Sequence, residues 1–241
     1  MIKGIHTVAS GMLPYLKRQE TFANNLANIN TPGFKKDGVF QKELSKAEQA
    51  SIPTESDWEQ PMVDEIHTDF SVGQMEYSGD DLDVAIEGDG FFVVSTENGE
   101  RYTRGGAFQL DSEGFLTTAS GDKVLTDGGP VTLIGSKIKI DGDGKISVDG
   151  SQVAQFMVVD FAKPYQLVKA EKGLFAPKNA DVTSQAAANF SIRQGYVEKS
   201  NVGAVEEMVN MVGSYRDYES GQKAIQIQDE TLQQLIEKLG K

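Results

Sequence analysis

The fold is decided at the C-terminal end by the stretch NVGAVEEMVNMVGSYRDYESGQKAIQIQDETLQQLIEKL, residues 201–239. Apolar side chains recur there at alternating spacings of three and four, with polar Gln222 and Asp229 in two of the slots. The series is Met208, Met211, Tyr215, Tyr218, Ile225, Leu232, Ile236 and Leu239, widened at its start by Val202, Val205, Val209 and Val212. This spacing predicts an amphipathic helix within residues 196–241. Asn201 is the predicted N-cap, and Glu206 and Glu207 suit the positive end of the helix dipole.

A second stripe of the same spacing occupies the N-terminal end, with Gln19 in one slot. Its members are Ile5, Val8, Met12, Tyr15, Phe22, Leu26 and Ile29. Pro14 lies inside this series, and a proline inside a helix costs about 3 kcal/mol. The helix therefore either bends near Gly11–Pro14 or begins its regular part there. The two stripes predict a coiled-coil-like helical assembly domain made of residues 1–34 and 196–241.

Two helices alone bury too little apolar surface to offset the entropy of ordering them. We therefore expect the termini to be partly disordered in a free monomer and to become ordered when neighbouring copies cover their remaining apolar faces. The predicted assembly interface consists of Ile5, Val8, Met12, Tyr15, Phe22, Leu26, Ile29, Val205, Met208, Val212, Tyr215, Ile225, Leu232 and Leu239.

The middle of the chain has the pattern of strands. Short β-branched or aromatic runs alternate with turns such as Asn98-Gly99, Asp127-Gly128 and Asp143-Gly144. The predicted strands are 83–87, 91–95, 101–103, 107–110, 115–118, 131–134, 137–140, 145–148 and 153–161. Residues 75–195 are therefore predicted to form an all-β domain, barrel-like or a sandwich. Residues 35–74 lack clear periodicity and are predicted to be an extended connection.

Charge and composition restrict the partners. The net charge is −13, which argues against nucleic acid and anionic lipid, because few basic residues are available to neutralise phosphates. Five basic residues stand against one acidic residue over 1–36, and five against eight over 196–241. The ends are oppositely charged, and a protein partner is expected. Polar residues near the start argue against a cleavable signal peptide, and no apolar run is long enough to span a bilayer.

Motifs for chemistry are weak. The chain has no cysteine, and His6 and His67 lie far apart, so no thiolate site, histidine metal pair or histidine triad is predicted. The stretch Asp141–Lys145 resembles the start of a calcium loop but has Lys145 where an acidic residue or Asn is needed, so a hairpin turn is favoured. Gly88-Asp89-Gly90 has no following helix to cradle a phosphate. We predict no catalytic residue, no metal and no cofactor.

The segment NNLANINTPGFK, residues 24–35, resembles the signature of the bacterial flagellar rod and hook protein family. The motif residues are Asn24, Asn25, Leu26, Ala27, Asn28, Asn30, Thr31, Pro32, Gly33 and Phe34. They have a local purpose too, because the asparagines can bond the backbone, Pro32 stops the helix and Gly33 permits a reversal. Residues 82–94, 102–116 and 194–209 resemble later family blocks in the same order, and 222–226 continues the last one. Length and residues 73–83 are most similar to the proximal rod proteins, with the distal rod proteins second.

The resemblance implies a subunit of the axial rod of the flagellar basal body, exported through the flagellar type III apparatus without signal-peptide cleavage. Its implied partners are copies of itself, other axial proteins of the rod and hook, and the export apparatus. A hook subunit is a weaker alternative, because hook proteins carry an extra domain. Two alternatives of other classes remain open: an extracellular glycan hydrolase using the carboxylates between Asp80 and Asp89, and a monomeric binding module.

Overall fold

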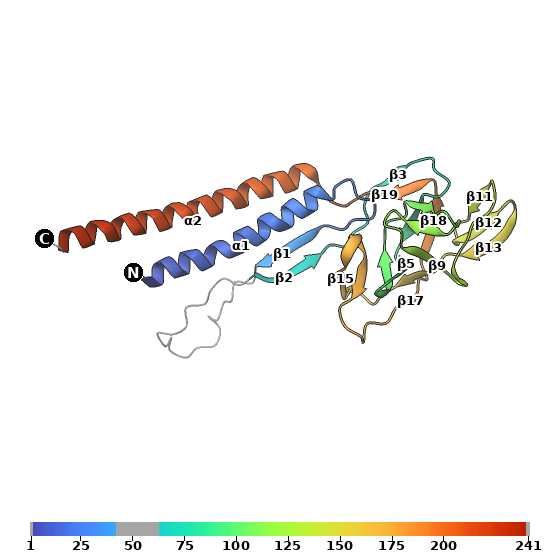
Figure 1. The fold of residues 1–241 in the computed structure, drawn as a ribbon, viewed down its shortest axis with the longest axis horizontal. Coiled ribbons are helices and arrows are strands. Elements are labelled where there is room, and N and C mark those ends of the chain that lie inside the picture. Colours follow the sequence, from blue (N-terminus) through green and yellow to red (C-terminus); the bar gives the residue numbers. More distant parts are fainter. Residues whose placement is uncertain (1, 42–62, 240–241) are drawn as a thin grey trace. The chain divides into compact units, whose positions relative to one another are not determined.

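The structure is a computed structural model that describes residues 2–41 and 63–239 (Figure 1). Two helices, α1 (Ile2–Ala27) and α2 (Ala204–Leu239), enclose the strands in sequence. The first strands are β1 (Asp37–Gln41), β2 (Val63–Thr68), β3 (Met75–Tyr77), β4 (Val84–Gly88), β5 (Phe91–Thr96), β6 (Gly99–Thr103), β7 (Phe108–Leu110), β8 (Leu116–Thr118), β9 (Lys123–Thr126) and β10 (Gly129–Pro130). The later ones are β11 (Ile138–Ile140), β12 (Lys145–Val148), β13 (Ser151–Gln155), β14 (Val158–Asp160), β15 (Leu167–Lys169), β16 (Phe175–Pro177), β17 (Gln185–Ala186), β18 (Phe190–Gln194) and β19 (Tyr196–Glu198), with a 3-10 turn η2 (Glu171–Gly173) after β15.

The chain divides into two compact units. The helical unit comprises Met1–Ala27, Asp37–Asp69 and Val202–Lys241, and the β unit comprises Asn28–Lys36 and Phe70–Asn201. The prediction of terminal helices around a largely β centre is confirmed.

In the helical unit, α1 and α2 pack along each other in antiparallel directions (Figure 1). The hydroxyl of Ser214 donates to the carbonyl of Tyr15 at 2.9 Å, and a Cβ added at Gly221 would lie 2.9 Å from Cγ of Met12. The helix α1 runs through Pro14 without interruption, so its regular part does not begin at that residue.

Strands β1 and β2 form an antiparallel ladder from Asp37↔Thr68 to Gln41↔Val63, and β1 packs on α1. The two ends of the predicted extended connection are therefore paired strands. Its middle, residues 42–62, lies outside the described residues.

The β unit is organised around β5, which is buried on both faces. Phe92 and Val94 face one hydrophobic core, with Phe108, Leu116 and Val124 among its members. Phe91 and Val93 face a second core with Tyr102, Phe161 and Phe175. The alternation of a strand sends successive side chains to opposite faces, so one strand serves both cores.

The largest sheet follows the order β15-β16-β6-β5-β9-β8-β7, with β10 on β9, and with β14 between β5 and β17. Smaller sheets are β11-β12-β13, β18-β4 and β19-β3, and every pairing is antiparallel. These sheets are open, so the barrel-like alternative is not confirmed. Residues 131–134 were predicted as a strand but contribute only the isolated bridge of Thr132 with Phe115.

Candidate assembly surface and motif contacts

The predicted apolar stripe of α2 is divided between two faces of the helix. One row of buried or half-buried positions strictly alternates spacings of four and three residues, while half-buried Ala204, Glu219 and Ala224 lie outside it. The row consists of Glu207, Met211, Ser214, Tyr218, Gly221, Ile225 and Gln228. We call this set the seam of α2. The part of the seam nearest the start of α2 is polar, because the buried side chains of the seam are those of Glu207 and Ser214. Of the predicted interface residues on α2, Ile225 lies in the seam.

Other predicted residues of α2 lie on the outside. Apart from Ile227, the exposed large apolar residues described on α2 form a set that we call the outer face, which consists of Val205, Met208, Val209, Val212 and Tyr215. Val205 is 76% exposed and Val209 is 65% exposed. These positions recur at helical spacings of three and four, so they share one side of α2. The side chains of Leu232 and Leu239 lie outside the described part of the structure.

The predicted residues of the N-terminal stripe are mostly covered. Met12 is buried, and Tyr15, Phe22, Leu26 and Ile29 are half-buried. The side chains of Ile5 and Val8 are not among those described. Leu13 and Leu16, which the heptad series did not include, are exposed.

Asn25 of the motif is completely buried and connects three parts of the helical unit. Its amide nitrogen donates to the carbonyl of Asp37 at 2.8 Å and to Oε2 of Glu207 at 3.1 Å. Its amide oxygen accepts from the N–H of Asp37 at 2.9 Å. One side chain thus fixes the end of α1, the start of β1 and the first turn of α2.

The motif from Asn28 onward forms the turn after α1, which ends at Ala27. The N–H of Thr31 donates to the carbonyl of Asn28 at 3.1 Å, and the N–H of Phe34 donates to the carbonyl of Thr31 at 3.2 Å. Gly33 has φ +71°, and a Cβ there would lie 2.1 Å from the backbone nitrogen of Gly105. Only glycine fits this position, for both the backbone conformation and the space. Asn24, Ala27, Asn30 and Thr31 are exposed, Pro32 is half-buried and Phe34 is buried.

A cluster of buried charged residues lies at the end of the motif, within the β unit. Lys35 forms an ion pair with Glu198, and both side chains are at most 1% exposed. The ammonium of Lys35 also donates to the carbonyl of Ser71 at 2.6 Å, and Oε1 of Glu198 accepts from the N–H of Gly73 at 2.9 Å. Arg104 Nη1 lies 3.6 Å from Oε2 of Glu198. We call Lys35, Arg104 and Glu198 the charge cluster. Its members are up to 163 residues apart, so no local pattern identified them.

The predicted cap of α2 was wrong. Asn201 lies three residues before the helix, and its Oδ1 accepts from the N–H of Lys36 at 2.7 Å. Its Nδ2 donates to the hydroxyl of Ser71 at 3.0 Å. The first helical bond runs from the N–H of Glu207 to the carbonyl of Gly203, so Gly203 occupies the cap position. Glu206 and Glu207 do lie in the first turn, as predicted.

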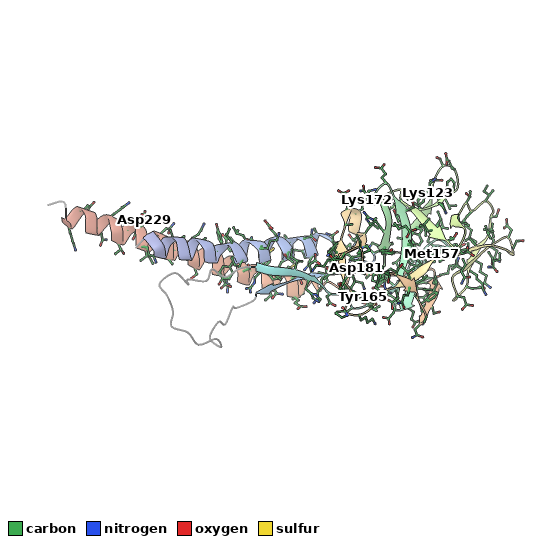
Figure 2. The ribbon with its side chains drawn as sticks, turned by 90° about the horizontal axis from the view of Figure 1, so that it is seen from below. Lys123, Met157, Tyr165, Lys172, Asp181 and Asp229 are labelled. Carbon is green, nitrogen blue, oxygen red and sulfur yellow. The ribbon has the colours of Figure 1, made fainter. Side chains whose placement is uncertain are left out.

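Tyr165 is a half-buried tyrosine that packs against the second core (Figure 2). Its ring packs against Phe70 and Phe91 at centroid distances of 5.1 and 5.5 Å, and its hydroxyl donates to Oδ1 of Asp160 at 3.0 Å. Burial first, and then the bond and the negative charge of Asp160, raise the pKa of Tyr165 above its ordinary value of 10.0.

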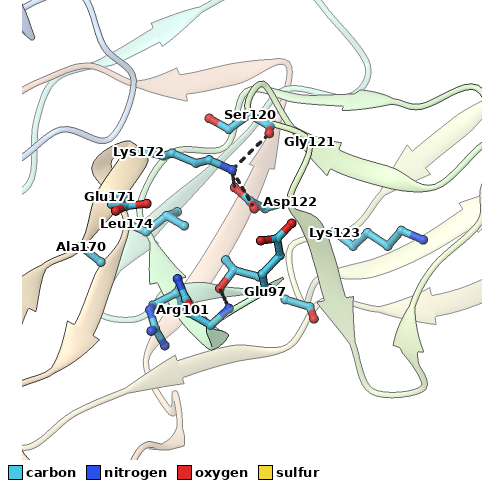
Figure 3. A pocket seen from close by; sticks show the side chains of 13 residues that line it. Glu97, Arg101, Ser120, Gly121, Asp122, Lys123, Ala170, Glu171, Lys172 and Leu174 are labelled. Carbon is cyan, nitrogen blue, oxygen red and sulfur yellow. Dashed lines mark hydrogen bonds and ion pairs between the residues drawn. The ribbon is translucent and has the colours of Figure 1, made fainter.

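Three of the carboxylates proposed for a hydrolase have structural partners. Asp80 accepts from the N–H of Leu82 at 2.9 Å, Glu87 pairs with Arg193 at 2.7 Å, and Asp89 pairs with Lys163 at 2.8 Å. A cavity of about 630 Å³ lies elsewhere in the β unit, between two hairpin turns and η2 (Figure 3). Lys172 bridges one wall by pairing with Asp122 at 3.2 Å. None of the carboxylates between Asp80 and Asp89 lines this cavity.

The calcium-like stretch is a hairpin turn, as predicted. Gly144 has φ +83°, and its N–H donates to the carbonyl of Asp141 at 2.9 Å. Among the described residues there is no group of three or more acidic, histidine or cysteine side chains that could hold a metal ion. Neither α1 nor α2, over its described length, is apolar enough to cross a membrane.

Comparison with known proteins gives matches along most of the chain. Three family models match: "Flagella basal body rod protein" over residues 5–35, "Flagellar hook protein FlgE/F/G D1 domain" over 85–151, and "Flagellar basal body rod FlgEFG protein C-terminal" over 193–238. The flagellar basal-body rod protein FlgG of Bacillus subtilis is 31% identical over 270 residues, covering 98% of each chain. FlgG of Borreliella burgdorferi is 33% identical over 96% of this chain and 97% of its own. FlgF of Caulobacter vibrioides is 31% identical over 100% of this chain and 99% of its own.

Proposed function

The chain belongs to the flagellar basal-body rod protein family, and we propose from this premise that its terminal helices polymerise it into the axial drive shaft. It is a structural subunit of the rod, and the matches to FlgG and FlgF proteins support a proximal rod protein. Its partners are other axial proteins of the flagellum. Self-polymerisation is the part of this proposal that the outer face of α2 supports.

The outer face carries the proposal because it leaves apolar surface in water. Five neighbouring side chains on one side of α2 are at least 49% exposed. Contiguous exposed apolar surface on a folded protein marks an interaction site more often than isolated apolar residues do. The basic N-terminal segment and the acidic C-terminal segment add charge complementarity between copies.

The register of the two helices supports the same conclusion. Tyr15 contacts Ser214, and Asn25 contacts Glu207. In this antiparallel register the last turns of α2 extend past the first turn of α1 (Figure 1). We propose that helices of neighbouring copies pack there in a coiled-coil-like arrangement, and that heterologous contacts repeated from copy to copy give an open helical layer.

The proposed functional division has residues 1–34 and 196–241 as the assembly domain, 35–74 as the connection and 75–195 as the β domain. Its boundaries differ from those of the two compact units, which place Asn28–Lys36 and Phe70–Asn201 together in the β unit. The subunit reaches the basal body through the flagellar type III apparatus without signal-peptide cleavage. Its role in the rod needs no catalytic residue, cofactor or metal.

The test is a charge placed on the outer face. Val209→Asp leaves the seam of α2 intact because Val209 is exposed, but it puts a carboxylate where the neighbouring copy packs. We expect rods to be missing from isolated basal bodies and swimming to be abolished, while the purified variant keeps its helix content. Asn210→Asp is the matched control, because this neighbouring position is exposed and polar already. Normal swimming of the Val209→Asp strain would contradict the proposal.

A further inference from the structure

Three segments of the chain converge on Glu198 in the β unit. Its carboxylate receives Lys35 and the N–H of Gly73, and its backbone carbonyl accepts from the N–H of Gly33 at 2.7 Å. The residue itself belongs to β19, whose pairing with β3 spans only three residues, Tyr196↔Tyr77 to Glu198↔Met75. Residues 33–36, 71–73 and 198–201 are therefore tied together around one buried carboxylate.

The chain crosses the boundary of the β unit at four residues, because the unit consists of Asn28–Lys36 and Phe70–Asn201. Three of these residues, Lys36, Phe70 and Asn201, lie in or next to the tied segments, and we call them the exits. Asn201 adds a second tie between the same segments, because it accepts from the N–H of Lys36 and donates to Ser71. A Cβ at Gly73 would lie 1.9 Å from the carbonyl oxygen of Lys199, which shows how closely two of the exits approach.

The charges at this point are expensive to bury. A buried ion pair repays its desolvation only with good geometry and further hydrogen bonds, and apolar replacements are often as stable. The cluster also leaves Nε of Arg104 and Oε2 of Glu198 without a hydrogen bond. An apolar core would hold the β unit together at lower cost, but it would not tie backbone groups of three separate segments to one residue. The charge cluster is therefore better suited to holding the three segments together than to stabilising the β unit in general.

We propose that Glu198 is a positioning residue that joins the exits at Lys36, Phe70 and Asn201, three of the four boundaries of the β unit, into one mechanical point. This inference rests on the proposed function, because a rod subunit must pass force between its helices and its β region. Without the cluster, pulling on Asn201 would separate β19 from β3 one backbone bond at a time. With it, the same pull must break the buried ion pair and the bonds to Gly33 and Gly73 together.

The three charges also fall one in each of the three segments that match the family. Lys35 is the last residue of the first matched segment, Arg104 lies in the second and Glu198 in the third. The cluster thus joins every matched part of the chain at a single point.

The experiment is single-molecule pulling on the purified full chain. The chain has no cysteine, so pairs of cysteines can be introduced as unique handles. The pair Asn30→Cys and Val205→Cys brings force in through the exits, and the pair Glu97→Cys and Ser151→Cys brings it in through exposed turns and strands of the β unit. Each pair is combined with Glu198→Gln, which keeps the shape of the side chain and removes its charge. Glu87→Gln is the matched control, because it removes an exposed ion pair with Arg193.

We expect Glu198→Gln to raise the forced unfolding rate about 100-fold or more when the pull enters through the exits, as the loss of a buried charge partner implies. We expect a clearly smaller rise along the other axis, and almost none in Glu87→Gln along either. An equal rise along both axes would show that Glu198 only stabilises the unit, and would overturn the proposal.

If Glu198→Gln does not fold, Asn201→Ala is used in its place. This substitution of a half-buried side chain removes the second tie and leaves the ion pair of Lys35 with Glu198 intact. The same difference between axes is then expected at smaller size, and its absence would overturn the proposal. Neither measurement depends on assembly. A chain that shows the axis dependence but fails to enter rods would contradict the proposed function alone.

Discussion

The helical unit and the β unit bury different kinds of side chain. In the β unit, Phe91 and Phe92 are at most 1% exposed and supply two apolar cores. Among the described side chains of α2, the buried ones are Glu207 and Ser214, while Val205 and Val209 are exposed. Because apolar burial is the main favourable term in folding, the described part of the β unit supplies more of its own stabilisation than the described part of the helical unit does.

This difference in burial indicates which unit depends on further contacts for its stability. A helix whose covered side is partly polar and whose open side is apolar fits our proposal that another chain packs on the open side. This agrees with the expectation that the termini become fully ordered in the assembled rod, which stays a prediction. The two units should therefore respond differently to the same kind of substitution.

The largest expected effect is in the β unit. Phe92→Ala removes a ring that lies 5.2 Å from Phe108 and 5.4 Å from Phe156 between centroids, and a buried Phe→Ala change costs about 3–5 kcal/mol. The loss in free energy of unfolding is measured by denaturant titration, with near-ultraviolet circular dichroism of the phenylalanine and tyrosine rings as the signal. Leu110→Ala, at a partly exposed position of β7, should cost much less. Equal losses would show that the first core is not the source of stability.

The next effect concerns the polar contacts of the helical unit. Asn25→Ala leaves the N–H and carbonyl of Asp37 and the carboxylate of Glu207 without this partner, and each buried group left so costs about 1–3 kcal/mol. We expect faster amide exchange at the end of α1 and in the first turn of α2, with unchanged exchange in β5. Asn30→Ala is the control, because Asn30 is an exposed asparagine of the same motif. Similar exchange in both variants would remove Asn25 from the account.

The two units also differ in how far their sequence predicted them. Some strands with partners close in the chain were predicted: 91–95 corresponds to β5 and 101–103 to β6, joined through the two-residue turn Glu97-Asn98. Others were not, because β9 pairs with the nearby β8 and β15 with β16, and the prediction contained none of β9, β15 and β16. The single strand predicted over 153–161 is divided between β13 and β14. The strand β18 was not predicted, because its register with β4, Phe190↔Gly88 to Gln194↔Val84, joins segments about a hundred residues apart. Residues 131–134 have a strand-like composition, yet Ile134 is 83% exposed and the segment lacks a continuous partner.

The residues of the candidate assembly surface and of the charge cluster were also predicted only in part. The heptad spacing identified the helices but could not choose which of two adjacent apolar rows faces α1, because Met208 and Met211 fit the series equally well. Only Met211 lies in the seam. The charge cluster escaped prediction since Lys35 and Glu198 are ordinary charged residues until the fold buries them together. Asn201 was assigned to the helix it precedes, but the N–H of Lys36 occupies its oxygen instead.

The smallest expected effect is a pH dependence of the β unit. The pKa of Tyr165 is raised in the folded protein, so the folded state holds this proton more tightly than the unfolded chain does. The contribution of Tyr165 is fully present below pH 10, near the unfolded pKa, and is lost as the pH rises beyond it. Tyr165→Phe removes this titration together with the bond to Asp160, while the remaining tyrosines are common to both proteins.

We therefore expect the variant to be slightly less stable than the parent at pH 8 and to lose less stability between pH 8 and pH 10.5, as shown by denaturant midpoints at the two values. The helical unit is the internal reference for this comparison. Its seam contains Tyr218, which is half-buried and is the same in both proteins. The same loss of stability in both proteins would mean that the hydroxyl of Tyr165 is solvated like an exposed one. The second core would then be open to water at its Asp160 side, and the contrast between a self-sufficient β unit and a dependent helical unit would be weaker than its buried rings indicate.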